Sequence, residues 1–332
     1  MKTVTLIPGD GIGPEIVRSV KEIFTAAQVP LTWDEQLMGE SALQETGQLM
    51  PEALIGSLER HRVGLKGPCT TPIGQGFRSV NVALRKRFQL YANIRPVNKL
   101  PGLETRWENV DIVLFRENLE GLYAGLEVYD EALQMADALK RVTQAGSERI
   151  IRAAFSYAKD NGKQKVALFH KANILKEADG LFLRVGRQVA EEFPEITLET
   201  YIIDNAFMQV VNRPETFEVI VTTNMFGDIL SDLLAAMVGG LGVVSGANIG
   251  KDCAVFEAVH GTAPDIAGKG IANPTGILLS ALQMLRHLNL DSYADNIQNG
   301  LETTYRNPEQ RTGDVGGQSN TQSFTQHLIS NL

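Results

Sequence analysis

The stretch FEVIVTTNMFGDILSDLLAAMVGG, residues 217–240, holds a strand-to-helix unit with no loop between its parts. Its first part, FEVIVTT, is a short apolar run typical of a buried strand, and the remainder has the apolar spacing of a packed helix. A strand that passes directly into a helix is the basic unit of an α/β protein with a mostly parallel sheet. This stretch therefore predicts an α/β fold class.

Strand-like and helix-like segments also alternate along the rest of the chain. Pro14 lies near the start of one helix-like segment, where the N–H that proline lacks would have no helical partner. The alternation extends the α/β prediction over the whole sequence. The expected strands are 2–8, 110–117 and 165–173, and the expected helices are 13–27 and 147–161, the second opened by a Ser-x-x-Arg start.

Two loop-like stretches interrupt this alternation, at 98–110 and at 239–251. If both are crossings between domains, one domain is built from the two chain ends and the other from the middle. The segment EVYDEALQMADALKRV, at 127–142, fits either a surface helix or a projecting arm that pairs with another subunit.

The composition is that of a soluble globular protein, with 332 residues, 43% hydrophobic and 21% charged. The two cysteines, Cys69 and Cys253, form neither a disulfide framework nor a zinc-site spacing, which indicates a reducing compartment. The N-terminus lacks a signal-peptide core, and no apolar run approaches the ~20 residues that cross a bilayer. We therefore expect a cytoplasmic protein that is not bound to a membrane.

One stretch departs from the net charge of -8: between Glu59 and Glu104 the chain has nine Lys or Arg and no Asp or Glu. A nucleic-acid surface is disfavoured, because the basic stretch is confined and its aromatic residues are not spaced as a stacking platform. A solvated helix face and a pocket for a small polyanion remain. We favour the pocket, because guanidinium groups from separate elements bind carboxylates well. The arginines concerned are Arg85, Arg95 and Arg116, with Ser79 near a helix start and Asn81 one turn before Arg85.

Asp228 and Asp232 stand four apart in the opening stretch, so they share one helix face. Like charges at this spacing repel each other. A solvated face is the plain interpretation, but the neighbours are apolar, and oxygen ligands of this kind suit Mg²⁺ or Mn²⁺. Asp204, after a strand-like run, is a candidate third carboxylate.

Two glycine-rich turns invite a nucleotide-binding interpretation. GDGIGPE, at 9–15, follows a strand and opens a helix, but its third glycine comes one place too early for a dinucleotide fingerprint, so we interpret it as a tight turn. HGTAPDIAGKGIANP, at 260–274, offers free backbone N–H groups and Asp265, whose carboxylate could accept hydrogen bonds from ribose hydroxyls.

Taken together, these segments resemble the β-decarboxylating dehydrogenases, which act on isocitrate, homoisocitrate, 3-isopropylmalate or tartrate. The resemblance runs nearly end to end, through LIPGDGIGPE, LYANIRP, RENLEGLYAG, HKANI, NMFGDILSD and HGTAPDIAGKGIANP. It implies a two-domain fold that is not a Rossmann fold, with a central sheet flanked by helices in each domain. Residues 1–99 with 239–332 would form the large cofactor-binding domain, and 100–238 a small domain with the metal carboxylates and the dimer interface.

The resemblance also implies roles for individual residues. Arg85, Arg95 and Arg116 match the arginines that clamp the substrate's carboxylates, and Tyr123 and Lys171 match the catalytic acid/base pair. Asp204, Asp228 and Asp232 match the carboxylates around a Mg²⁺ or Mn²⁺ ion. In the family the lysine and one aspartate come from the partner subunit, so Lys171 and Asp204 would act across a homodimer, or a higher oligomer with the same shared sites.

The substrate and cofactor follow from two short motifs of the family. Members that act on isocitrate have Ser-x-Asn-x-x-x-Arg in the substrate helix, as Ser79, Asn81 and Arg85 stand here, which implies oxidative decarboxylation of isocitrate. Members that use NADP have a Lys-Tyr pair where this chain has Asp265 and Ile266, and an aspartate would repel the 2′-phosphate, which implies NAD. The other implied cofactor contacts are Thr71, His260, Gly261, Thr262, Ala263, Pro264 and Asn273.

Alternatives remain at this stage. Activity on homoisocitrate is the runner-up, followed by 3-isopropylmalate, since one methylene can change discrimination by as little as ~1–3 kcal/mol. A non-catalytic regulatory subunit is a further alternative, although such subunits lose catalytic or metal residues that this chain retains. The family's Arg-Glu-Asn-Thr-Glu-Gly motif has Leu119 in place of the threonine here.

Overall fold

The structure is a computed structural model that describes residues 2–72 and 79–332. Phe77 and Arg78, in the acid-free stretch, lie outside the described residues. The chain divides into two compact units: residues 1–88, 98–108 and 235–332 form unit 1, and residues 89–97 and 109–234 form unit 2. Unit 2 thus takes residues 89–97, which the sequence-based boundary left with the chain ends.

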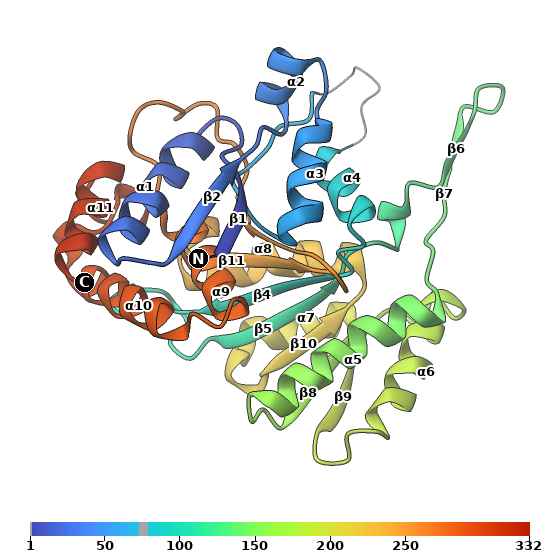
Figure 1. Cartoon of the computed structure of the whole chain (residues 1–332). Coiled ribbons are helices and arrows are strands. Elements are labelled where there is room, and N and C mark those ends of the chain that lie inside the picture. Colours follow the sequence, from blue (N-terminus) through green and yellow to red (C-terminus); the bar gives the residue numbers. More distant parts are fainter. Residues whose placement is uncertain (1, 73–78) are drawn as a thin grey trace. The chain divides into compact units, whose positions relative to one another are not determined.

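Unit 1 is a sheet with helices packed on it (Figure 1). The strand order is β2-β1-β3-β12-β11, parallel except for the antiparallel pair β11 and β12. Strand β1 confirms the strand predicted at 2–8, and its side chains from Val4 to Ile7 are buried. The strands are β1 (Lys2–Ile7), β2 (Leu31–Glu35), β3 (Val63–Lys66), β11 (Ser245–Ile249) and β12 (Ala254–Ala258). The helices are α1 (Gly13–Ala26), α2 (Glu40–Thr46), α3 (Glu52–His61), α4 (Val80–Arg87), α9 (Thr275–His287), α10 (Asp291–Arg306) and α11 (Thr321–Ser330).

Unit 2 has a second run of strands in the order β4-β5-β10-β8-β9, in which β5, β10, β8 and β9 pair in parallel. The opening stretch of the sequence forms β10 and α8, as predicted. The strands are β4 (Ala92–Asn98), β5 (Asp111–Glu117), β8 (Lys165–His170), β9 (Thr197–Ile202) and β10 (Val219–Thr222). The helices are α5 (Gln144–Asp160), α6 (Ala178–Ala190), α7 (Ile203–Asn212) and α8 (Asn224–Val238), whose last four residues fall in unit 1.

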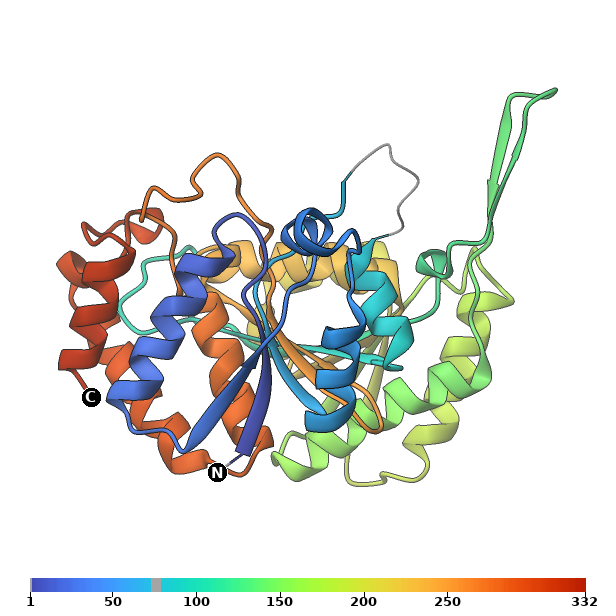
Figure 2. The same cartoon turned by 45° about the horizontal axis from the view of Figure 1, so that its top comes forward.

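The ambiguous segment at 127–142 is an arm and not a helix. Strands β6 (Glu127–Asp130) and β7 (Met135–Ala138) pair as an antiparallel ribbon that extends away from α5 and α6 (Figure 2). Its side chains are exposed, including 66% of Val128 and 69% of Leu133. The apolar residues of this arm, hereafter the β6–β7 arm, therefore cover no core of their own chain.

The fold-class prediction is confirmed, with small differences at the element ends. Helix α5 begins at Gln144 and not at Ser147, because the side chain of Thr143 caps it by accepting the N–H of Gly146 at 3.0 Å. Ser147 donates its hydroxyl to the carbonyl oxygen of Thr143. In the described part of the chain, no helix has the length and apolar character needed to span a membrane.

Candidate active site

Strand β5 and helix α8 position the most buried arginine of unit 2. Arg116 pairs in register with Thr222, the last residue of β10, so its side chain reaches the point where α8 begins. Gly227 makes room for it, since a Cβ at this position would lie 2.6 Å from Arg116 Cγ. Arg116 is only 1% exposed. The strand-to-helix unit thus holds a guanidinium group against the first turn of α8.

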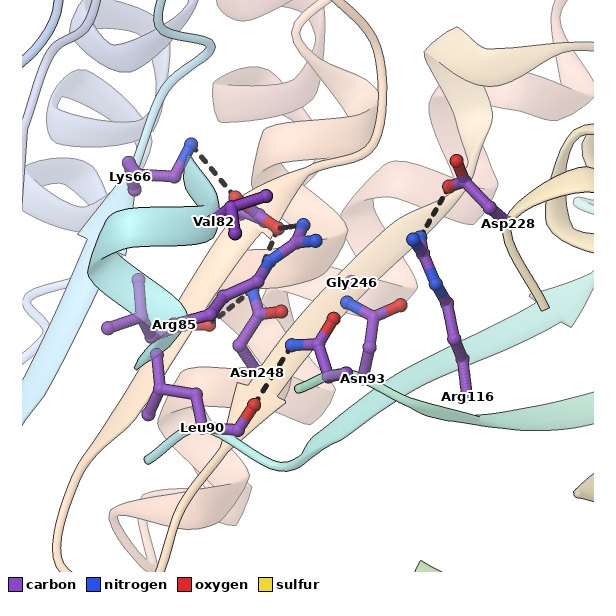
Figure 3. Close-up of polar contacts among 12 residues, drawn as sticks. Lys66, Val82, Arg85, Leu90, Asn93, Arg116, Asp228, Gly246 and Asn248 are labelled. Atoms are coloured by element: carbon purple, nitrogen blue, oxygen red, sulfur yellow. Dashed lines mark hydrogen bonds and ion pairs between the residues drawn. The ribbon is translucent and has the colours of Figure 1, made fainter. Parts of the chain in front are cut away.

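Arg116 connects two other predicted site residues of unit 2, Asp228 and Tyr123. Its guanidinium forms an ion pair with Asp228 (Figure 3) and donates two hydrogen bonds to Asn224 Oδ1, at 2.8 and 3.1 Å. The same guanidinium lies 5.3 Å from the centre of the Tyr123 ring. Tyr123, in a short 3₁₀ turn, donates its hydroxyl to the second oxygen of Asp228 at 2.6 Å. Asp228 therefore has a cation on one oxygen and a phenol on the other.

Arg95 approaches the same helix from β4. It is 6% exposed, donates to Asn93 Oδ1 at 2.7 Å and donates to Ser231 Oγ. Ser231 in turn donates to the carbonyl oxygen of Asp228 at 2.6 Å. Arg95, Arg116, Tyr123 and Asp228 thus form one hydrogen-bonded network in unit 2.

The carboxylates of Asp228 and Asp232 fit part of a divalent-cation site. They lie one turn apart on α8, they are partly or fully exposed, and all their donor atoms are oxygens, which suits Mg²⁺ or Mn²⁺. Among the described residues, however, no group of three possible protein ligands gathers in one place. Asp204 therefore does not join the pair within a single chain.

Asp204 and Lys171 instead form an ion pair with each other in unit 2. Asp204 lies in the first turn of α7, which begins at Ile203 directly after β9 ends at Ile202. The hydrogen bond from Lys171 is the main reason why the pKa of Asp204 lies below its ordinary value. The Asp204 side chain is 69% exposed, so the pair faces outward.

Helix α4 in unit 1, with its N-cap Ser79, carries three of the five predicted substrate residues. Ser79 caps the helix by accepting the N–H of Val82 at 3.4 Å, which confirms the predicted helix start. Thr71 accepts the N–H of Val80 at 2.9 Å. Asn81 Oδ1 is buried and has no hydrogen-bond partner among the described residues. Such an atom is suited to a bound ligand, because a buried polar atom without a partner is costly.

Arg85 on α4 has a partner that the sequence analysis missed. Its guanidinium donates to Glu257 Oε1 at 3.0 Å, and Asn248 donates to the same oxygen at 2.7 Å. The ammonium group of Lys66 lies 2.8 Å from Glu257 Oε2. Burial opposes ionisation of Glu257, but Lys66 and Arg85 outweigh it and hold the pKa of Glu257 well below its ordinary value. The two cations and one carboxylate leave an excess positive charge beside α4.

This cluster corrects the explanation offered for the acid-free stretch. Arg85 and Arg87 of this stretch have acidic partners within the protein and do not depend on a ligand alone for charge balance. Glu257 forms an ion pair with Arg85, and Glu59 forms one with Arg87 at 2.7 Å. Arg116 likewise has Asp228 as its partner. Their acidic partners lie far away in sequence, which is why a local charge count could not find them.

A pocket of about 360 Å³ in unit 1 contains several of the predicted cofactor residues. Burial lowers the pKa of His260, and its Nε2 is buried without a hydrogen-bond partner among the described residues. A neutral imidazole whose Nδ1 donates to the carbonyl oxygen of Gly261, 3.0 Å away, would leave Nε2 to accept from a ligand hydroxyl or amine. The pocket is lined by Ile12, Gly242, His260, Gly261, Ala263, Ile266, Ile271, Ala272, Asn273 and Asp314.

This lining fits an adenine nucleotide, with apolar side chains for a flat ring and a few polar groups at its edge. The predicted contacts Thr262, Pro264 and Asp265 belong to the same loop but do not line the pocket. Asp265 is exposed. Thr262 accepts the side-chain hydrogen bond of Thr70 at 3.1 Å.

The GDGIGPE turn contributes to this pocket although it is not a dinucleotide fingerprint. It supplies Ile12, whose N–H donates to the carbonyl oxygen of Thr262 at 2.9 Å. The carboxylate of Asp10, 8% exposed, accepts the backbone N–H groups of Glu40, Ser41 and Thr70 at 2.8–2.9 Å. One aspartate thus connects the GDGIGPE turn to the start of α2 and to the segment at Thr70. The glycine spacing gave no signal for this role.

Leu119, which departs from the family motif, makes its local contacts through its backbone. Its N–H donates to both oxygens of Glu117, at 3.0 and 3.1 Å. Burial raises the pKa of Glu117 in spite of these bonds.

Comparisons with known proteins agree with the resemblance. Residues 3–329 match the family model described as isocitrate/isopropylmalate dehydrogenase. A mitochondrial NAD isocitrate dehydrogenase catalytic subunit 5 from Arabidopsis thaliana is 48% identical over 331 residues, which cover 99% of this chain and 88% of that protein. A chloroplastic 3-isopropylmalate dehydrogenase from Solanum tuberosum is 49% identical over 301 residues, 90% and 84% of the two chains. The crystal structure of isocitrate dehydrogenase from Methylococcus capsulatus has a TM-score of 0.96 at 45% identity, covering 100% and 99% of the two chains.

The prediction of a cytoplasmic location is wrong in the light of these relatives. The NAD isocitrate dehydrogenase subunits from plant, animal and fungal sources are named as mitochondrial. The argument from unpaired cysteines indicated a reducing compartment, and the mitochondrial matrix is also reducing. Two free thiols therefore could not separate the two locations.

Proposed function

Because the chain belongs to the isocitrate/isopropylmalate dehydrogenase family, we propose that it is an NAD-dependent isocitrate dehydrogenase that yields 2-oxoglutarate and CO₂. The observation that carries this proposal is the network of unit 2, in which two buried arginines and a tyrosine converge on the carboxylate helix α8. A tricarboxylate needs such guanidinium groups, and an oxidised hydroxyl carbon needs an acid and a base beside it.

Tyr123 and Lys171 are the proposed acid and base. Lys171 takes the proton of the substrate hydroxyl, and a bound NAD⁺ would supply the hydride acceptor for the same carbon. Loss of CO₂ then leaves the electron pair of the broken C–C bond as an enolate, and Tyr123 returns a proton to the carbon that carried the departed carboxylate. The contact between Tyr123 and Asp228 supports this role, because it holds the phenol in one orientation.

The metal part of the proposal rests on the oxygen atoms of α8. Asp228 and Asp232 would hold a Mg²⁺ or Mn²⁺ ion together with Asp204 of a second chain. When bound, such an ion stabilises negative charge that develops on the substrate oxygen. Arg116 holds Asp228 in place for this purpose.

A second copy of the chain is the proposed source of Lys171 and Asp204. Their ion pair faces outward. Three exposed apolar side chains lie within four residues of Lys171 or Asp204 in sequence: Ile174 (67% exposed), Ile202 (36%) and Met208 (52%). Ile229 (53% exposed) follows Asp228 on α8. Exposed apolar side chains near functional groups are typical of a subunit interface. We therefore propose a dimer with shared sites.

The choice of isocitrate rests on α4. The hydroxyl of Ser79 and the Nδ2 amide group of Asn81 give this helix hydrogen-bond donors beside Arg85 for a third carboxylate. Homoisocitrate and 3-isopropylmalate are the alternative substrates. An alkyl group would gain nothing from the two polar side chains.

The test is NAD⁺ reduction by the purified protein with each of the three substrates. We expect kcat/KM to be highest for isocitrate with Mg²⁺ or Mn²⁺ and activity to disappear with EDTA. Asn81→Leu is the matched variant: it should lower kcat/KM for isocitrate by about ten- to a hundredfold while 3-isopropylmalate gains relative to it. A wild-type preference for 3-isopropylmalate would refute the substrate proposal. No turnover with any of the three would favour the regulatory-subunit alternative.

A further inference from the structure

A buried ion pair beneath the proposed catalytic lysine has no assigned role. Asp179 in α6 is fully buried, and it forms an ion pair with Lys140, whose side chain is 14% exposed. The second oxygen of Asp179 accepts the backbone N–H of Lys171 at 2.7 Å. One carboxylate thus holds both a distant lysine and the main chain of the proposed base.

The hydrogen bond from the Lys171 N–H to Asp179 joins the two ends of the loop that carries Lys171. Strand β8 ends at His170, so Lys171 is the first residue after the sheet, and α6 starts at Ala178. The loop between them is exposed, with Ile174 67% exposed. Turn hydrogen bonds link the N–H groups of Ile174 and Leu175 to the carbonyl oxygen of Lys171. The first residue of this exposed loop is therefore held by the fully buried carboxylate of Asp179.

Lys140 fixes the other side of Asp179. It lies at the base of the β6–β7 arm, two residues after β7 ends, and its ammonium group is 4.5 Å from the centre of the Phe226 ring. Phe226 stands on α8, two residues before Asp228. The same ammonium group therefore contacts the carboxylate beneath Lys171 and the helix that carries the proposed metal ligands.

A purely stabilising role is a weak explanation for this pair. Removing two charges from water costs about as much as their attraction returns, so an apolar pair of the same size would often be as stable. A buried carboxylate that is bound by Lys140 and by the Lys171 N–H fixes the orientation of the Lys171 backbone. A catalytic group gains from that, since misplacement by about 1 Å can cost on the order of a hundredfold in rate.

We propose that Asp179 and Lys140 are positioning residues that set the place of Lys171 in the active site of the partner subunit. The inference rests on the proposed function, in which Lys171 of one chain completes the site of the other. Asp179 itself does not contact the substrate. Its effect is therefore felt in the partner's site and not in the site formed by the Tyr123 and Asp228 of its own chain.

The first experiment separates the chemical step from binding. Asp179→Asn should lower kcat for isocitrate at least tenfold and change the KM for isocitrate less than threefold, because the arginines that bind the substrate are untouched. Glu192→Gln, the same kind of change at an exposed ion pair of the same unit, is the matched control and should leave both constants unchanged. An Asp179→Asn variant that folds and keeps wild-type kcat would overturn the proposal.

The second experiment asks which site Asp179 serves. Hybrid dimers are prepared by co-expression of two differently tagged chains. A hybrid of Asp179→Asn with Tyr123→Phe keeps one site with an intact tyrosine and an intact lysine loop, so it should recover about half of the wild-type activity. A hybrid of Asp179→Asn with Lys171→Met has a defective lysine supply at both sites and should recover at most about a twentieth, half of the activity that a tenfold loss leaves.

A hybrid of Lys171→Met with Tyr123→Phe distinguishes failure of the positioning proposal from failure of the shared-site proposal. If it recovers half of the activity but the hybrid of Asp179→Asn with Tyr123→Phe does not, the positioning proposal is wrong and the shared sites stand. If the Lys171→Met hybrid recovers nothing while wild type turns over isocitrate, the shared-site proposal fails instead. A general folding defect in Asp179→Asn would depress both of its hybrids equally, which also contradicts the proposal.

Discussion

At the scale of single residues, the most informative side chain is Glu257. It is buried between Lys66 and Arg85 and receives a hydrogen bond from Asn248. The sequence showed the two cations as part of an unexplained basic stretch, and the fold supplies their acid from β12, 172 residues after Arg85. The charge of Arg85 is therefore shared between the protein and any bound carboxylate.

Replacing Glu257 by Gln should destabilise the protein by about 3–5 kcal/mol, because two buried cations lose their anion. Urea unfolding at neutral pH measures this change. Glu59→Gln, which removes a carboxylate from the exposed pair with Arg87, is the control, and its expected effect is below about 1 kcal/mol. Equal effects of the two substitutions would contradict the buried-cluster interpretation.

The same residue predicts a pH dependence of stability. The folded state keeps Glu257 ionised because its pKa lies below the ordinary value, whereas in the unfolded chain it takes up a proton near 4.5. Since the unfolded state then binds more protons, the stabilisation is present above about pH 4.5 and is lost as the pH falls below it. Unfolding of wild type should become easier through this range, and Glu257→Gln should show a flatter curve.

At the scale of elements, the GDGIGPE turn is a junction of loops. Asp10 accepts the N–H groups of Glu40 and Ser41, at the start of α2, and of Thr70, and Ile12 lines the pocket. Gly39 approaches Asp10 so closely that a Cβ would lie 2.2 Å from its oxygen. The turn therefore shapes the cofactor pocket through backbone contacts.

Asp10→Asn should weaken NAD⁺ binding about tenfold, equivalent to about 1.4 kcal/mol, because an amide cannot accept all three N–H groups. Isothermal titration with NAD⁺ measures this without turnover. Asp34→Asn is the matched control: Asp34 accepts from Ser57 at 2.7 Å in the same unit, away from the pocket. It should lose stability but keep NAD⁺ affinity. If Asp34→Asn weakens NAD⁺ binding as much, the effect is not local to the turn.

The β6–β7 arm is the second informative element. The ribbon has no core of its own, and a two-stranded ribbon is marginally stable in water unless something packs against it. Val128 and Leu133 are exposed by 66% and 69%. These features agree with the arm alternative of the sequence analysis, in which the segment pairs with another subunit.

Replacing Val128 and Leu133 together by Asp should lower the molar mass of the assembly in light scattering, because charges replace the apolar contact. Asp137→Asn, on the same ribbon, keeps the apolar side chains and should leave the mass unchanged. A double variant with the wild-type mass would exclude this arm from the interface.

At the scale of the whole molecule, no group of three His, Cys, Asp or Glu side chains that could hold a metal ion gathers among the described residues of a single chain. If sites are shared between chains, specific activity should fall on dilution once the dimer dissociates. Measuring turnover against protein concentration, with substrate and metal held constant, checks this expectation. Specific activity that is independent of concentration, together with a monomeric mass, would contradict shared sites.

The sequence alone determined the alternation of strands and helices, the strand-to-helix unit at 217–240, the shared face of Asp228 and Asp232 and the cap at Ser79. These features follow from short-range rules: the apolar period, the helix spacing and the first-turn N–H groups. The motifs also sufficed to recognise the family, which the comparisons confirm.

Only the tertiary structure decided which charges meet. Glu257 reaches Arg85, and Asp10 accepts N–H groups from the start of α2 and from Thr70. Asp179 accepts the N–H of Lys171, and Asp204 stays apart from the carboxylates of α8. Such pairings depend on how the chain returns to itself over tens to hundreds of residues, and local spacing does not encode that path. Local propensities therefore gave the elements, whereas burial, through the cost of leaving a charge unpaired, selected the partners once the sheet had brought them together.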